Sequence, residues 1–128
     1  MKALIIALLP ILCQVESGNN PAALGDYSSG EYRAVGCLQI WKIVVDDVNR
    51  IQKKEVFTYK DRSDRIKSLR MAEIYLTHYG KHYEKKTGHK ANMEVLAAIW
   101  CSGPTGYKKM NQKGVRNYIQ KVKKELEK

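Results

Sequence analysis

The sequence predicts a mainly α-helical protein folded as one domain over residues 1–128. Five segments either repeat apolar residues at the three- and four-residue steps of an amphipathic helix or are apolar throughout, as in a buried helix. The stretches between them are rich in Gly, Asn, Ser and charged residues and hold almost no strand pattern. A chain of 128 residues, 44% of them hydrophobic, is long enough to bury one core.

The first expected helix covers residues 3–17. An almost unbroken apolar run, Ala3 to Cys13, leads into it, and the turn-forming residues 18–21 end it. The run has the basic start and apolar core of a signal peptide, but no clear small-x-small cleavage site follows, and it is too short for a membrane span. We therefore predict a retained, buried helix, in which Pro10 marks a kink or places the regular part from about Leu9 onward.

The next three segments differ in expected structure. Residues 18–34 are dense in turn formers, so we expect a loop there. Residues 35–40 are apolar around one Gln and one Gly, which indicates an extended piece or a tight turn. Residues 41–51 are predicted to be helical, because four apolar residues recur at helical spacing. These are Val44, Val45, Val48 and Ile51.

The longest periodic signal follows Ser63, which we expect to be the N-cap of a helix. We expect this helix to end near Gly80 and residues 81–90 to be loop. The predicted buried stripe consists of Ile66, Leu69, Ala72, Leu76 and Tyr79.

Two more helices are expected in the C-terminal part. Asn92 is a suitable N-cap for an apolar helix over residues 93–101, which must be surrounded by other elements. Residues 102–106 break it, and the last helix begins near Gly114. Its apolar face consists of Val115, Tyr118, Ile119, Val122 and Leu126.

The net charge of +10 favours anionic partners, namely nucleic acid, a membrane surface or an acidic wall polymer. Residues 107–128 hold eight Lys or Arg against two Glu, a local excess of +6. No nucleic-acid-binding motif is present, so we do not expect a nucleic-acid partner.

The cysteines indicate neither a disulfide nor a metal site in the sequence. Three of them cannot all pair within one chain, and Cys13, Cys37 and Cys101 form no CxxC motif. Reduced thiols are the simpler expectation. Their spacing to His78 and His82 matches no metal motif, so no metal site is predicted.

Glu16 is the residue with the most distinctive setting, because its carboxylate lies at the end of an apolar helix. Burial disfavours the ionised form of a carboxyl group. A carboxylic acid that stays protonated near neutral pH is what a general acid requires. A Glu at a helix end is also commonly solvated and without function, and the helix dipole disfavours it there.

Four motifs, in order, resemble the soluble lytic transglycosylase type of the lysozyme-like family, in its compact phage-encoded or bacterial form. The resemblance covers nearly the whole chain. The motifs are Val-Glu-Ser-Gly-Asn-Asn-Pro at 15–21, Ala-Val-Gly-Cys-Leu-Gln-Ile at 34–40, Trp-Cys-Ser-Gly-Pro at 100–104 and Tyr-Ile-Gln-Lys-Val at 118–122.

The resemblance implies a lysozyme-like single domain with helices around a substrate cleft, and no cofactor. Glu16 matches the family's catalytic acid. The other matching residues, which the resemblance assigns to substrate binding, are Ser17, Leu38, Gln39, Trp100 and Tyr118. Cys101 departs from the family, which has Asn there, and this puts sugar or loop contacts at that position in doubt.

The implied reaction cleaves the β-1,4 bond between N-acetylmuramic acid and N-acetylglucosamine without water and leaves a 1,6-anhydro end. One alternative is a true lysozyme, which needs a second carboxylate, from Asp26 or Glu31. Another is a non-enzymatic basic binding module. The expected partners are peptidoglycan glycan strands and anionic wall polymers, bound by a monomer.

We expect action at the cell wall or periplasm. With no clear cleavable signal, a phage-encoded enzyme of the endolysin kind would be released by a membrane-opening partner or carried in the virion.

Overall fold

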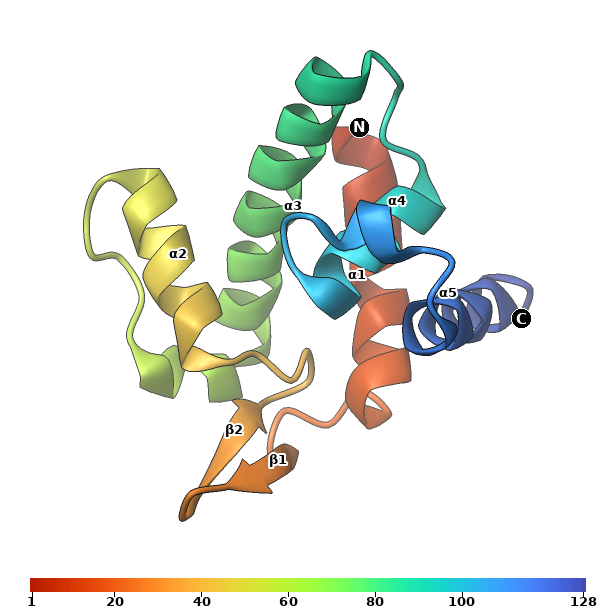
Figure 1. The fold of residues 1–128 in the computed structure, drawn as a ribbon. Helices are drawn as coiled ribbons and strands as arrows, with labels where there is room; N and C mark the ends of the chain where they lie inside the picture. Colours follow the sequence, from red (N-terminus) through yellow and green to blue (C-terminus); the bar gives the residue numbers. More distant parts are fainter. The chain divides into compact units, whose positions relative to one another are not determined.

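The computed structural model describes all 128 residues and is mainly helical, which confirms the predicted class. It has five α-helices, one hairpin and two short 3-10 helices. The α-helices and the two strands are labelled in Figure 1. The helices are α1 (Lys2–Ser17), α2 (Lys42–Gln52), α3 (Arg65–Thr87), α4 (Met93–Ser102) and α5 (Lys113–Leu126). The other elements are β1 (Leu24–Ser28), β2 (Glu31–Val35), η1 (Tyr59–Ser63) and η2 (Gly106–Lys109).

The chain divides into two compact units. Unit 1 comprises residues 1–12 and 76–128, and unit 2 comprises residues 13–75. Helices α1 and α3 each contribute residues to both. None of the helices is both long enough and apolar enough to cross a bilayer.

Helix α1 is continuous from Lys2 to Ser17, with Pro10 inside it, so the predicted helix over residues 3–17 is confirmed. The helix is regular well before Leu9, so the expected start near Leu9 is wrong. Pro10 is tolerated inside the helix because it removes only one hydrogen-bond donor and its side chain is exposed. The buried residues follow the spacing of a single helical stripe. They are Ile5, Leu8, Leu9, Leu12 and Cys13.

The centre of unit 1 is α4, as expected for its apolar sequence. Residues 95–99 are all buried. The Asn92 side chain accepts a hydrogen bond from the Val95 N–H at 2.9 Å, which confirms the predicted N-cap. Helix α4 contacts both α5 and η2. Helix α5 buries Val115, Ile119 and Val122 on the predicted face, whereas Tyr118 is half-buried and Leu126 exposed.

The prediction that residues 18–34 are loop was wrong, because they contain an antiparallel hairpin. Its register pairs Leu24 with Val35 and Ser28 with Glu31. The two turn residues between the strands both have positive φ, the geometry of a type I′ hairpin turn. Four of the five residues of β1 are exposed, and Ala34 is the only buried residue of β2. No buried face therefore produced the alternating pattern by which a strand is recognised in sequence.

The predicted end of α3 near Gly80 was also wrong, since the helix continues to Thr87 and stops at Gly88, where φ is +77°. Gly80 lies inside the helix for a packing reason. A Cβ at this position would come within 2.6 Å of Met1 Sδ and 3.2 Å of Leu96 Cδ2 in unit 1. A glycine that permits close packing resembles a helix stop in sequence.

The start of α3 corrects two further predictions. Asp64, not Ser63, performs the capping role, because its Oδ1 accepts a hydrogen bond from the Lys67 N–H at 3.0 Å. Ile66, expected in the buried stripe, is 79% exposed, and the first buried side chain of the helix is Ser68.

Candidate functional site

Glu16 lies in the last turn of α1 and is half-buried within unit 2. The chain directly after it is held from two sides. Ser17 Oγ donates to the Cys37 carbonyl oxygen at 2.8 Å, and Arg65 Nε donates to Asn19 Oδ1 at 3.1 Å. The end of α1 is therefore attached both to the segment after β2 and to the start of α3.

The segment over residues 35–40 is a tight turn, one of the two forms expected for it. Val35 and Ile40 exchange both backbone hydrogen bonds, at 3.1 and 2.9 Å. Gly36 has φ of +89°, and a Cβ there would lie only 1.8 Å from the Arg62 carbonyl oxygen. This position needs glycine both for its backbone conformation and for the close approach of η1.

Two residues of this turn were expected to bind substrate, and the structure gives each a structural contact. Leu38 is 0% exposed and belongs to the core of unit 2. Gln39 Nε2 donates to the carbonyl oxygens of Ala23, at 3.2 Å, and Gly36, at 2.9 Å. The Gln39 amide therefore joins the turn to the chain just before β1.

Trp100 and Tyr118 belong to unit 1, on the neighbouring helices α4 and α5, and both are half-buried. Cys101, at the position where the family has Asn, is exposed. Of the predicted site residues, Glu16, Ser17, Leu38 and Gln39 belong to unit 2, where the hydrogen bond from Ser17 to Cys37 joins the two segments that carry them, while Trp100 and Tyr118 belong to unit 1.

Unit 2 also contains a pocket of about 260 Å³ that the sequence analysis did not identify. It combines exposed aromatic rings with charged side chains. Its lining residues are Glu31, Tyr32, Arg33, Trp41, Lys42, Ile43 and Arg62. No local pattern marks this set, since it comes from β2, the start of α2 and η1.

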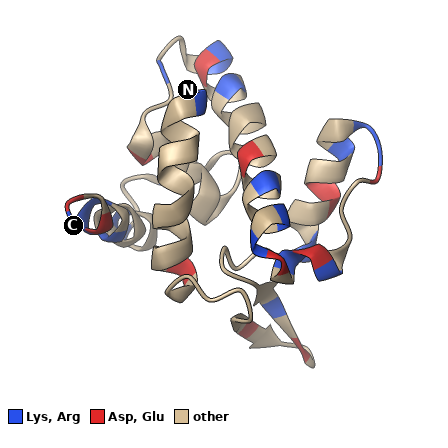
Figure 2. Cartoon of the chain, turned by 180° about the vertical axis from the view of Figure 1, so that it is seen from behind, with Lys and Arg blue, Asp and Glu red and all other residues tan.

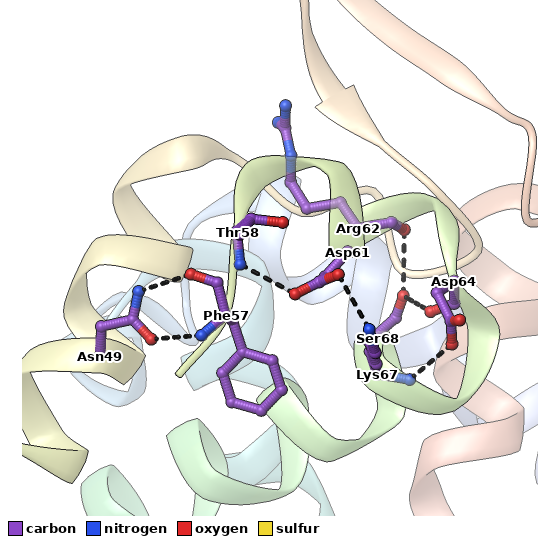
Figure 3. Close-up of polar contacts among 8 residues, drawn as sticks. All are labelled: Asn49, Phe57, Thr58, Asp61, Arg62, Asp64, Lys67 and Ser68. Carbon is purple, nitrogen blue, oxygen red and sulfur yellow. Dashed lines mark hydrogen bonds and ion pairs between the residues drawn. The ribbon is translucent and has the colours of Figure 1, made fainter. Parts of the chain in front are cut away.

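Arg62 is unusual in this pocket because only 7% of it is exposed and it forms no ion pair. Its Nε donates to the Tyr59 carbonyl oxygen at 2.8 Å and its Nη1 to that of Ile40 at 3.1 Å. Burial lowers the pKa of Arg62 from its ordinary value. Its side chain points away from the other residues drawn in Figure 3.

The backbone of η1 is held by a network of side chains, shown in Figure 3. The Asp61 carboxylate accepts hydrogen bonds from the Thr58 N–H at 2.8 Å and from Lys67 Nζ at 3.3 Å. The Thr58 hydrogen bond and the Lys67 charge hold the pKa of Asp61 below its ordinary value. Ser68 Oγ donates to the Arg62 carbonyl oxygen at 3.0 Å. The carbonyl that faces Gly36 is therefore fixed in place.

The two acids considered as a second carboxylate lie on the hairpin. Asp26 is exposed, with φ of +51°. Glu31 begins β2, and its carboxylate is 3.6 Å from Arg33 Nη1 and 3.5 Å from Lys42 Nζ. Glu31 is thus placed by a strand and by two cations, not by an irregular loop.

The positive charge is distributed over the chain. In Figure 2, Lys and Arg recur along α3 and α5 and are interspersed with Asp and Glu. Lys123 of α5 forms an ion pair with Glu94 of α4 inside unit 1.

Comparisons of the chain with protein-family models, with characterised proteins and with solved structures found no match. The transglycosylase resemblance therefore depends on the four sequence motifs.

Proposed function

We propose that the chain is a peptidoglycan-degrading enzyme, a lytic transglycosylase with Glu16 as its catalytic acid. The observation that carries the proposal is the setting of Glu16 in unit 2. Glu16 is half-buried at the end of an apolar helix, next to Ser17, whose hydroxyl donates a hydrogen bond to the Cys37 carbonyl oxygen. The segments over residues 15–21 and 34–40, which carry two of the four motifs, are therefore in contact.

The proposed reaction uses one carboxyl group twice. Protonated Glu16 donates to the glycosidic oxygen as the bond to the muramoyl C1 breaks. The resulting carboxylate takes the proton of the muramoyl C6 hydroxyl, whose oxygen attacks C1 and closes the 1,6-anhydro ring. Glu16 regains its proton, so no second acid is needed. Acid–base catalysis of this kind contributes roughly 10²–10⁴-fold.

The pocket in unit 2, whose lining residues do not include Glu16, has side chains suited to binding a carbohydrate. The exposed rings of Tyr32 and Trp41 provide flat apolar faces of the kind on which sugar rings stack. Arg33 and Lys42 line the same pocket and can donate hydrogen bonds to sugar oxygens or to the lactyl carboxylate of muramic acid.

A second candidate, a hydrolysing lysozyme, is favoured by one observation. A base that activates water must be held within hydrogen-bond reach. Glu31 meets the requirement for a fixed position, because β2, Arg33 and Lys42 restrain it.

The proposal is tested with Glu16→Gln, which preserves shape and removes the proton donor. We expect clearing of purified peptidoglycan to fall about 100-fold or more. Glu127→Gln, an exposed change of the same type and charge near the C-terminus, is the matched control and should leave clearing unchanged. Circular dichroism confirms that each variant is folded. Equal clearing by Glu16→Gln and the wild type would overturn the assignment.

Mass spectrometry of the released muropeptides separates the two enzymes. A transglycosylase leaves 1,6-anhydro ends, lighter by one water than the products of hydrolysis. Reducing ends, together with an inactive Glu31→Gln variant, would identify a lysozyme. Binding of peptidoglycan without any released product would identify a binding module.

A further inference from the structure

Two of the three cysteines, which no sequence motif connects, meet inside unit 2. Cys13 comes from the last turns of α1 and Cys37 from the turn after β2. Their Sγ atoms are 3.1 Å apart, and both residues are 0% exposed. Cys101 is exposed and lies in unit 1.

The surroundings make the two thiols different. The hydrogen bond donated by the Cys13 thiol lowers the pKa of Cys37 to about 7, with a further contribution from the positive charge of Arg65. The same hydrogen bond, together with burial, raises the pKa of Cys13. The negative charge of Glu16 also raises the pKa of Cys13. Cys37 is therefore the sulfur that ionises first and attacks as a nucleophile.

We propose that Cys13 and Cys37 are a disulfide-forming site that reacts by thiol–disulfide exchange with a small disulfide such as oxidised glutathione. The Cys37 thiolate attacks one sulfur of the oxidant and expels one glutathione thiolate. Cys13 then loses its proton, attacks the Cys37 sulfur of the mixed disulfide and expels the second glutathione. The two cysteine thiols lose two electrons and two protons, which the oxidant gains as two glutathione thiols.

The geometry requires only a small movement for closure. The Sγ atoms must approach from 3.1 Å to the bonded distance of about 2.05 Å. Because both sulfurs are buried, the oxidant reaches them during folding or local opening.

The bond would have a structural consequence beside Glu16. The Ser17 hydroxyl already bonds to the Cys37 carbonyl oxygen at 2.8 Å. A disulfide would join the same two segments covalently and restrict the unfolded chain. This inference does not depend on the proposed enzymatic function, since it concerns the state of the thiols alone.

The experiment uses the full chain with Cys101→Ser, which leaves the pair intact and removes the exposed thiol. The protein is refolded with oxidised glutathione or with a reductant, and its thiols are alkylated in denaturant. We expect the oxidised sample to lose two hydrogens in intact mass, to take up no alkylating agent and to yield a cross-linked peptide with Cys13 and Cys37. Its Tm should exceed that of the reduced sample by on the order of 10 °C.

Two results would overturn the proposal. One is a sample refolded with oxidised glutathione in which both thiols remain open to alkylation. The other is a persistent mixed disulfide with glutathione on either cysteine. Cys37→Ser in the Cys101→Ser background is the control, and it should show the same Tm with and without oxidant. The comparison of oxidised with reduced Cys101→Ser protein decides the question even where Cys37→Ser does not fold.

Discussion

Replacing Gly36 with alanine tests the closest approach made to any glycine of the chain, in the turn whose Cys37 carbonyl oxygen accepts a hydrogen bond from Ser17. Gly36 has φ of +89°, and its missing Cβ would lie 1.8 Å from the Arg62 carbonyl oxygen and 2.9 Å from the carbonyl carbon. Alanine therefore meets two separate costs. One is backbone strain at positive φ, and the other is collision with a backbone group that cannot rotate away.

The magnitude follows from adding the two costs. Positive φ costs an L-residue about 1–2 kcal/mol. Overpacking costs about 1–3 kcal/mol, and the Arg62 backbone has little freedom to relieve it because Ser68 and the Thr58–Asp61 pair hold η1. We expect the free energy of unfolding to fall by about 2–5 kcal/mol. At roughly 4 °C per kcal/mol for a chain of this size, Tm should fall by about 8–20 °C.

Two other glycines provide matched controls. Gly30 has φ of +83° and nothing within 4 Å of its Cβ position, so Gly30→Ala carries only the strain. Gly106 has no positive φ, but its Cβ would lie 2.1 Å from the Ala98 carbonyl oxygen, so Gly106→Ala carries only the collision. Urea unfolding followed by circular dichroism measures all three. The reasoning is refuted if Gly36→Ala destabilises no more than Gly30→Ala.

Two further substitutions test contacts that the structure describes. Asp61→Asn removes a carboxylate whose pKa in the folded protein lies below the ordinary 3.8. The ionised carboxylate therefore stabilises the fold at pH values above the unfolded pKa, and this stabilisation is lost as the pH falls through the folded pKa. The loss of stability should therefore be largest at neutral pH and disappear in strong acid. Urea unfolding of the variant and the wild type at several pH values measures this loss. A loss that does not change with pH would contradict the prediction. Asn92→Ala removes the N-cap bond to Val95 and should cost about 1 kcal/mol, or roughly 4 °C in Tm. An unchanged Tm would show that this cap contributes nothing.

The sequence by itself determined the features that depend on neighbouring residues. Helix α4 follows from an apolar run after a capping Asn92, and α5 from residues of one face at helical spacing. Helix α1 was predictable for the same reason, because Pro10 interrupts only one backbone hydrogen bond. The position of Glu16 at the end of an apolar helix was also visible in the local sequence.

Only the tertiary structure decided the features that depend on distant residues. Helix α3 continues through Gly80, where the side chains of Met1 and Leu96 pack in the space that a Cβ would occupy. The hairpin was missed because Ala34 is the only buried residue of its two strands, so the sequence shows no alternation of apolar and polar residues. In the candidate site, the bonds of Gln39 to Ala23 and Gly36 and the pocket around Arg62 join segments that no sequence period connects. The meeting of Cys13 with Cys37 has the same cause: a helix end and a turn become neighbours only when unit 2 packs, because spacing along the chain does not specify which buried side chains share a core.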